Sequence, residues 1–275
     1  MNLPEATTSM DKAMLLERFF FRVRSTPNAI LFLDYDGTLA PFNVDRQQAR
    51  PYPGVRDAIE RIVAAGNTRV VIISGRYASE LQPLLGLAQP VEIWGSHGWE
   101  RVWPDGRYDV ADLPPDALRG LAEADCGDEE ITALGGELEQ KPGCLAVHWR
   151  GRAPQQIDAI RSQVLENWAL LARESGLELH EFDGGLELRV PGRHKGLAVD
   201  IVLNECNAGP ETAIAYLGDD LTDEDAFRVL AGRGLRVLVR REPRPSAADV
   251  RLVPPVELLE FLNHWADIDE QRSIR

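Results

Sequence analysis

Cysteine is scarce in this chain of 275 residues, which contains only three. Cys126, Cys144 and Cys206 lie far apart and show none of the close spacings typical of metal ligands. Three cysteines also cannot form a complete set of intramolecular disulfides. A reducing compartment is therefore the simpler interpretation, and we expect a cytoplasmic protein.

Long apolar runs are also missing. No stretch approaches the roughly 20 consecutive apolar residues that cross a bilayer. The amino-terminal segment is interrupted by Asp11, Lys12, Glu17 and Arg18, so it does not have the pattern of a targeting peptide. We therefore expect a protein that is not associated with a membrane.

An excess of positive charge is absent as well. The chain has 30 Lys and Arg residues against 44 Asp and Glu residues, which gives a formal net charge of -14. This balance disfavours nucleic acid as a partner, because a nucleic-acid footprint needs clustered positive charge. A small anionic substrate is still allowed, because a few basic side chains or a metal ion can outweigh the global charge locally.

Buried strands alternate with amphipathic helices over much of the chain, which contains no internal repeat. Apolar runs predict strands at 29–33, 69–74, 91–95, 213–218 and 235–239. Helical spacing predicts helices at 54–66, 78–85 and 195–203, and another after Thr222. This alternation is typical of an α/β fold with a doubly wound parallel sheet and helices on both faces.

The middle of the chain has a different pattern of apolar and polar residues. CLAVHWR alternates with a period of two, a long helix follows around 157–171, and LELHEF and GLELRV read as paired strands joined by a turn at Asp183. We expect an inserted α+β cap at 108–187, between a first core segment at 1–107 and a second at 188–275.

Acidic residues gather where two predicted core strands end. Asp34 and Asp36 follow one strand, and Asp219, Asp220 and Asp223 follow another. Because the carboxyl ends of parallel strands share one edge of a sheet, these carboxylates should lie close together. So much negative charge is unfavourable without a cation, and Mg²⁺ suits an open site of oxygen ligands that also accepts a phosphate.

Two simpler explanations cover part of this pattern. Thr222 with Asp225 three residues later resembles a helix cap, and acids favour helix amino termini. A helix cap does not account for Asp219 or Asp220. Similarly, the DYDG segment alone could form a plain turn, but a turn does not need a second acid cluster on another strand.

With a cation present, the two acids of DYD can divide the work of phosphoryl transfer. Asp34 would attack phosphorus, and Asp36 would act as general acid and then as general base. Ser74, with backbone donors from Gly75 and Arg76, could bind the phosphate, and Lys195 could supply a fixed positive charge. Taken singly, a serine after a strand is usually a helix cap, and a lone lysine is usually a solvated surface charge.

The ordered set DYDGT, ISGR, a Lys-Gly pair and GDD resembles the haloacid-dehalogenase-type phosphatases. The longer segments LFLDYDGTLAPF, VVIISGR, GSHGWE and LGDDLTDEDAF are similar to those of trehalose-6-phosphate phosphatases in particular, over about residues 30–227. The resemblance implies a Rossmann-like core with an inserted cap. It also implies roles for individual residues: Asp34 as nucleophile, Asp36 as acid/base, Ser74 and Lys195 on the phosphate, and Mg²⁺ held by Asp34, the backbone carbonyl of Asp36 and Asp219, with Asp220 and Asp223 supporting the metal site.

The same resemblance implies a sugar-binding surface on the cap. It assigns substrate contacts to Lys141, His148, Arg150 and Glu187. Alternation alone would instead predict an ordinary solvent-facing sheet surface at these positions. His97 and Glu100 lie close after the third strand and are further candidates for contacting the sugar or for supporting residues that do. For His97, a structural role is nearly as consistent with its position.

These observations predict a Mg²⁺-dependent enzyme of trehalose biosynthesis that hydrolyses trehalose 6-phosphate. Phosphatases for sucrose phosphate, glucosylglycerol phosphate or a cyclitol-glycoside phosphate are alternatives, because the core motifs do not specify the sugar. A phosphomutase and a non-catalytic sugar-phosphate-binding module are further alternative hypotheses. The expected partner is a small sugar phosphate, and the sequence does not specify an oligomeric state.

Overall fold

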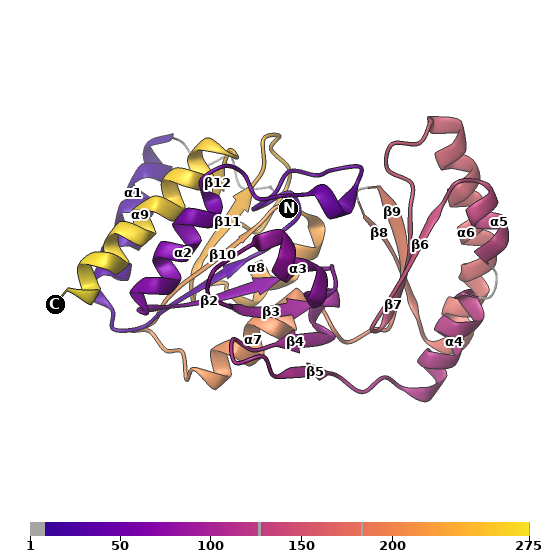
Figure 1. The fold of residues 1–275 in the computed structure, drawn as a ribbon, viewed down its shortest axis with the longest axis horizontal. Helices are drawn as coiled ribbons and strands as arrows, with labels where there is room; N and C mark the ends of the chain where they lie inside the picture. The colour runs from indigo at the N-terminus through magenta and orange to yellow at the C-terminus, as the bar shows by residue number, and fades with distance from the viewer. Residues whose placement is uncertain (1–8, 126–127, 183, 275) are drawn as a thin grey trace. The chain divides into compact units, whose positions relative to one another are not determined.

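The computed structural model describes residues 9–125, 128–182 and 184–274. Cys126 and the expected turn residue Asp183 lie outside these ranges. The chain divides into two compact units: a core formed by Met1–Tyr108 with His194–Arg275, and a cap formed by Asp109–Arg193 (Figure 1).

The core contains a sheet of eight strands in the order β12-β11-β10-β1-β2-β3-β4-β5. The strands from β12 to β3 pair in parallel, and β4 pairs antiparallel with β3. This arrangement confirms the predicted α/β class. The core strands are β1 (Ala29–Leu33), β2 (Thr68–Ile73), β3 (Glu92–Gly95), β4 (Glu100–Val102), β5 (Tyr108–Val110), β10 (Ala213–Gly218), β11 (Leu235–Val239) and β12 (Val250–Leu252).

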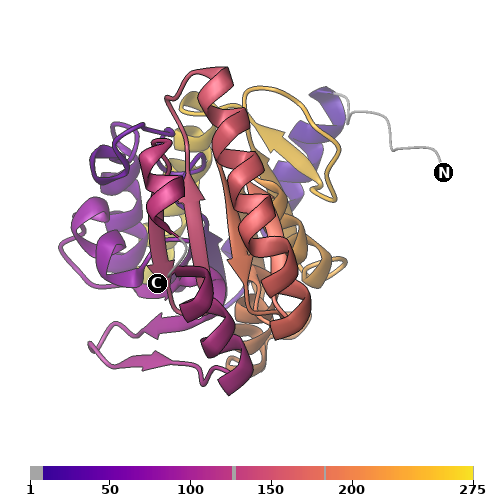
Figure 2. The same ribbon diagram turned by 90° about the vertical axis from the view of Figure 1, so that its right-hand side faces the viewer.

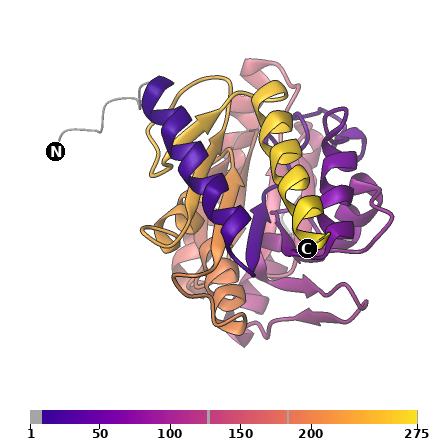
Figure 3. The ribbon, with the colours of Figure 1, turned by 90° about the vertical axis from the view of Figure 1, so that its left-hand side faces the viewer.

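Helices cover both faces of this sheet, because alternate residues of each strand point to opposite sides. Leu31 and Leu33 of β1 pack with helices α1, α2, α3 and α9, whereas Ile30 and Phe32 pack with α7 and α8. Figure 3 shows α1 and α9 lying side by side on the first face. The core helices are α1 (Ser9–Ser25), α2 (Val55–Ala65), α3 (Ala78–Leu85), α7 (Lys195–Glu205), α8 (Glu224–Val229) and α9 (Val256–Ser273).

The site is positioned by the change in strand order at β1. From β1 the chain continues to β2 and β3 on one side, and after the cap it returns to β10 on the other side of β1. Such switch points leave a crevice at the carboxyl ends of the two central strands. The β1–β10 ladder extends one residue past β1, because the Asp34 amide donates to the Leu217 carbonyl at 2.9 Å.

The cap is an α+β unit with a four-stranded antiparallel sheet in the order β6-β7-β9-β8. Its helices cover one face, and Figure 2 shows α4 and α6 side by side over the strands. The predicted boundary at 187 falls inside β9, which pairs with β7 and β8 and so belongs wholly to the cap. The cap elements are α4 (Pro115–Asp125), α5 (Asp128–Ala133), β6 (Glu137–Lys141), β7 (Cys144–His148), α6 (Pro154–Ser175), β8 (Glu178–Phe182) and β9 (Gly185–Arg189).

Three short 3-10 helices complete the described secondary structure: η1 (Arg46–Gln48), η2 (Ser96–Gly98) and η3 (Leu221–Asp223). The expected helix after Thr222 therefore begins as η3 and continues as α8. Within the ranges that the structure describes, no helix has both the length and the apolar character needed to cross a membrane.

Candidate active site

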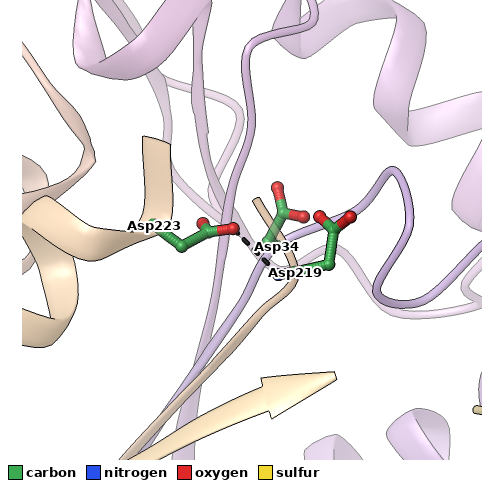
Figure 4. Close-up of side chains that lie close together, drawn as sticks. All are labelled: Asp34, Asp219 and Asp223. Carbon is green, nitrogen blue, oxygen red and sulfur yellow. Dashed lines mark hydrogen bonds between the residues drawn. The ribbon is translucent and has the colours of Figure 1, made fainter. Parts of the chain in front are cut away.

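Two carboxylates from different strands meet at the carboxyl edge of the core sheet. Asp34 directly follows β1 and Asp219 directly follows β10, and Figure 4 shows both side chains next to Asp223. Ligand oxygens of these three acids lie within 4.8 Å of one another. Asp34 and Asp219 are 3% and 2% exposed, so the charge is concentrated where water provides little screening. Three of the five acids predicted to gather at this edge thus lie together.

Lys195, the first residue of α7, provides the matching positive charge. Its ammonium donates to Asp34 Oδ1 at 2.6 Å and to Asp223 Oδ1 at 2.7 Å. The other Asp34 oxygen accepts from the Thr38 hydroxyl at 3.0 Å. The lysine is 3% exposed. It is therefore a component of the acidic cluster and not a solvated surface charge.

Burial is the largest single influence on the pKa values of the groups in this cluster. It raises the pKa of Asp34 to about 7, while Lys195 opposes the rise and Asp223 adds to it. Burial, and then the charges of Asp34 and Asp223, raise the pKa of Asp219 well above its usual range. Desolvation of Lys195 is outweighed by its two acidic partners, so its pKa is raised. The three acids outnumber the single lysine, so the cluster has an excess of negative charge, as expected for a site that binds a cation.

Asp223 fills a structural position within the cluster. Its Oδ1 accepts from Lys195 and from the Tyr216 hydroxyl at 2.7 Å, and its Oδ2 accepts the backbone amides of Asp219 and Asp220, each at 2.9 Å. Both lone pairs of each oxygen are thereby used. Asp223 thus caps the turn after β10 and orients Lys195, so it is poorly suited to bind a metal. Asp225, which the sequence suggested as part of a helix cap, instead pairs with Arg228.

The carboxylate oxygens of Asp34 and Asp219 suit a divalent cation. Asp219 Oδ1 is buried and has no hydrogen-bond partner among the described residues, which is unusual for a carboxylate oxygen. The turn at Gly37 allows the approach of this side chain, because a Cβ at position 37 would lie 2.1 Å from Asp219 Oδ2. Asp34 and Asp219 can therefore serve as metal ligands. Asp36, predicted to bind the metal through its backbone carbonyl, and Asp220, predicted to support the site, contribute no carboxylate to the close acidic group among the described residues.

Asp36 faces a different partner. Its carboxylate accepts from Arg76 Nε at 2.6 Å and from Arg76 Nη2 at 2.7 Å. Arg76 follows Ser74 and Gly75 at the end of β2, and its backbone amide donates to Ser74 Oγ at 3.2 Å. That bond uses only a lone pair of the hydroxyl oxygen, so the hydroxyl hydrogen of Ser74 is still a donor for a ligand.

His97 and Glu100 support the loop of Ser74. His97 donates its backbone amide to the Ser74 carbonyl at 3.0 Å. A Cβ at position 75 would lie 2.6 Å from the His97 ring, so this ring packs directly on Gly75. Glu100 accepts from the Ala78 amide at 2.9 Å and the Ser96 hydroxyl at 2.8 Å, so it stabilises the turns on either side. These contacts favour a structural role for both residues.

Two further arginines lie at the site, and no motif or spacing in the sequence pointed to them. Arg244, in the loop after β11, donates to the backbone carbonyls of Asp219 and Asp220 at 3.2 and 2.7 Å. Arg240 lies 3.8 Å from Asp219 Oδ2. Arg244 fixes the backbone that carries Asp219. Thr38, by contrast, belongs to the DYDGT motif and could have been identified there.

The cap carries a second charged cluster, on the sheet face opposite its helices. Lys141 Nζ lies 3.0 Å from Glu187 Oε1 and 3.3 Å from Glu139 Oε2, and His148 Nε2 lies 2.8 Å from the same Glu139 oxygen. Arg189 Nε is 3.8 Å from Glu187. Lys141 and Glu187 are only 5% and 4% exposed. On an ordinary solvent-facing sheet surface these side chains would be in contact with water, so their burial argues against that interpretation.

The cap cluster includes three of the four predicted sugar contacts. Lys141, His148 and Glu187 lie on one face of the sheet, in successive rows of the ladder formed by β6, β7 and β9, and Glu139 links Lys141 to His148. Arg150 lies beyond the end of β7, where its side chain packs over Gly184. Glu139 and Arg189 were not predicted, although their place on the same face follows from strand alternation.

The family model described as Trehalose-phosphatase matches residues 32–253 of this chain. The chain is 32% identical over 250 residues to the trehalose-phosphate phosphatase of Mycobacterium avium, a match that covers 86% of this chain and 62% of that protein. It is 33% identical over 253 residues to an uncharacterized glycosyl hydrolase of Mycobacterium tuberculosis, which covers 87% of this chain and 18% of that protein. The chain therefore spans less than two thirds of the length of these curated relatives.

Solved structures share the fold. The C-terminal domain of a trehalose-6-phosphate phosphatase from C. albicans superposes with a TM-score of 0.77 at 19% identity, over 97% of this chain and 99% of that one. A haloacid dehalogenase-like hydrolase from Bacteroides thetaiotaomicron gives a TM-score of 0.59 at 16% identity, over 86% and 98% of the two chains. At these identities the likeness establishes the fold and not the substrate.

Proposed function

We propose that this chain, which belongs to the trehalose-phosphatase family, hydrolyses trehalose 6-phosphate to trehalose and phosphate through an aspartyl-phosphate intermediate. The observation that carries the proposal is the environment of Asp34. This buried carboxylate is held by Lys195 and Thr38 at a strand end, beside the partly unsatisfied carboxylate of Asp219. A fixed, desolvated carboxylate next to a fixed cation is suited to attack an anionic phosphate.

The reaction needs two steps. In the first, an Asp34 oxygen bonds to phosphorus while the P–O bond to the sugar breaks, and the departing sugar oxygen takes a proton from Asp36. In the second, a water oxygen bonds to phosphorus as Asp36 accepts a proton from that water. The bond between phosphorus and Asp34 then breaks, which releases phosphate and restores both acids.

Several residues would bind the transferred group. The Lys195 ammonium would offset the phosphate charge, and the Ser74 hydroxyl would donate to a phosphate oxygen. Mg²⁺ would be held by the carboxylates of Asp34 and Asp219 and the backbone carbonyl of Asp36. When bound, it would neutralise the carboxylates and polarise the phosphate.

The cap cluster would select the sugar. Lys141, His148 and Glu187 offer donors and acceptors of both signs on one sheet face, as needed to recognise sugar hydroxyls. Glu139 and Arg189 belong to the same network and would hold these side chains in position. We include Arg150 in this proposal because it follows the same strand as His148.

A phosphate-release assay tests this function. The purified chain is incubated with Mg²⁺ and a panel containing trehalose 6-phosphate, sucrose phosphate, glucosylglycerol phosphate and a cyclitol-glycoside phosphate, with Asp34→Asn as the inactive control. Preferential hydrolysis of trehalose 6-phosphate is expected. Preference for another sugar would replace the substrate assignment, and phosphate release by a deamidation-free Asp34→Asn preparation would remove the proposed nucleophile. Release from no substrate would favour a non-catalytic binding module.

A further inference from the structure

Arg76 was expected to bind substrate, but its guanidinium is committed to Asp36. Two of its nitrogens donate to the two carboxylate oxygens, at 2.6 and 2.7 Å. This fork-to-fork geometry is the strongest form of an Arg–carboxylate pair, and it fixes the orientation of the carboxylate as well as its distance. The side chain of Arg76 is 4% exposed, whereas that of Asp36 is 27% exposed.

The arginine is itself held rigidly. Its backbone amide donates to Ser74 Oγ at 3.2 Å, and its carbonyl accepts from the Ser96 amide at 2.7 Å. The guanidinium carbon lies 5.7 Å from the centre of the Tyr35 ring, and the third nitrogen, Nη1, is 3.8 Å from Glu80. With each nitrogen facing a partner and almost no exposed surface, Arg76 has little capacity to bind a substrate.

The position of Asp36 matters at both steps of the proposed reaction. Its carboxyl group must reach the departing sugar oxygen in the first step and the attacking water in the second. Proton transfer requires heavy atoms about 2.6–3.2 Å apart, so a freely rotating carboxylate would spend much of its time out of reach. The Asp36 side chain has two rotatable bonds, so its contacts with neighbouring groups decide which orientation it adopts.

We propose that Arg76 is a positioning residue for Asp36, which it orients through both carboxylate oxygens so that this acid can exchange protons with the sugar oxygen and with water. The inference rests on the proposed function, since it assumes that Asp36 is the acid/base. To protonate the sugar oxygen, Asp36 releases one of the two hydrogen bonds and keeps the other. Arg76 therefore holds the carboxyl group through one hydrogen bond while the proton is transferred.

Arg76→Lys tests this role, because lysine keeps the positive charge but cannot form the two-pronged pair. Arg236→Lys is the matched control. Arg236 makes the same two-pronged contact, through Nε and Nη2, with the two oxygens of Asp249, but it lies on β11 outside the proposed site. Arg76 is more buried than Arg236, so unfolding by urea is measured for both variants, and a difference in chemistry between the folded proteins reports the role of Asp36.

Two readouts distinguish positioning from a structural role. The first is kcat/KM for trehalose 6-phosphate compared with p-nitrophenyl phosphate, whose nitrophenolate departs without needing a proton. General acid catalysis contributes about 10²–10⁴-fold, so partial loss of positioning should lower the value for the sugar phosphate by roughly 10–100-fold and change the aryl value only a few-fold. The second is a burst of nitrophenolate with a phosphorylated protein detected by intact mass, because slow second-step proton transfer lets the acyl phosphate accumulate.

The outcomes separate the two proposals. If the Asp36→Asn variant, incubated with p-nitrophenyl phosphate, accumulates no phosphorylated protein, the proposed function fails. If Asp36→Asn traps the intermediate but Arg76→Lys behaves like Arg236→Lys in both readouts, only the role of Arg76 is refuted. Should Arg76→Lys fold poorly, Arg76→Gln is measured in the same way. In the Asp36→Asn background, either Arg76 variant should leave the substrate ratio unchanged, and a further fall would contradict positioning.

Discussion

Replacing Gly37 with alanine should disable the candidate metal site through a single methyl group. Gly37 has a φ of +81°, and a Cβ added there would lie 2.1 Å from Asp219 Oδ2 and 2.4 Å from Asp219 Cγ. The position therefore disfavours alanine for two separate reasons: a left-handed backbone and a direct clash with a buried carboxylate. Asp219 follows β10 and its backbone is fixed by Arg244, so relief of the clash must come mainly from its side chain.

The expected effects follow from these distances. Ordinary van der Waals contact requires the Asp219 carboxylate to move by roughly 1 Å or more. A shift of about 1 Å in a reacting constellation can lower activity by ~10²-fold. The left-handed backbone adds a loss of stability of about 1–3 kcal/mol.

The assay measures kcat, the Mg²⁺ concentration for half-maximal activity, and unfolding by urea. Gly106→Ala is the matched control, because Gly106 has a φ of +85° but nothing within 4 Å of an added Cβ. Both variants should lose stability from backbone strain. Only Gly37→Ala should lose activity by roughly 10²-fold and require about 10-fold more Mg²⁺. Wild-type activity and Mg²⁺ dependence in a folded Gly37→Ala protein would refute the proposed metal-binding role of Asp219.

Three other predictions concern the metal, the cap and pH. Exhaustive EDTA treatment should abolish phosphate release and added Mg²⁺ should restore it; full activity without metal would show that the acidic cluster is not a metal site. His148→Ala and Glu187→Ala should each lower kcat/KM for trehalose 6-phosphate by about one to two decades more than for p-nitrophenyl phosphate, since a lost buried polar contact costs roughly 1–3 kcal/mol; a parallel fall would assign them to folding. Hydrogen bonds from Arg101, and then from Arg69, lower the pKa of Glu205 to about 2 from its usual 4.5. Its contribution to stability is thus present above pH 4.5 and lost as pH falls towards 2, so Glu205→Gln should lower Tm at pH 7 and the difference should shrink across that window; a constant difference would contradict the ion pairs.

The local chemistry of the strand ends was predictable from the sequence. The apolar runs of β1 and β10 have the predicted bounds, because a strand buried on both faces leaves a continuous apolar run with a polar residue at its end. The edge on which Asp34 and Asp219 meet followed from the general rule for parallel sheets. The motif resemblance added roles that neither periodicity nor spacing could assign.

The less periodic elements were not predicted. Strands β4, β5 and β12 have only three residues each, too few to form a recognisable alternation. Helix α1 was not predicted either, although its residues Phe19, Phe20 and Val23 pack in the core. The predicted cap boundary at 187 divides β9, although the alternating sequence GLELR already pointed to a strand paired with the one before it.

The sequence by itself determined which groups could do chemistry: two acids after one strand, an acid cluster after another, and a lysine at the start of a helix. The tertiary structure alone decided how these groups are paired. Arg76 lies 40 residues from Asp36, and Arg244 lies 25 residues from Asp219, so only the folded arrangement of loops brings each pair together. It also decided that Asp223 is fully hydrogen-bonded while Asp219 keeps a buried oxygen without a partner among the described residues. The physical reason is that residue type and strand periodicity are local properties, whereas the direction of a side chain and its burial depend on neighbours that are distant in the chain.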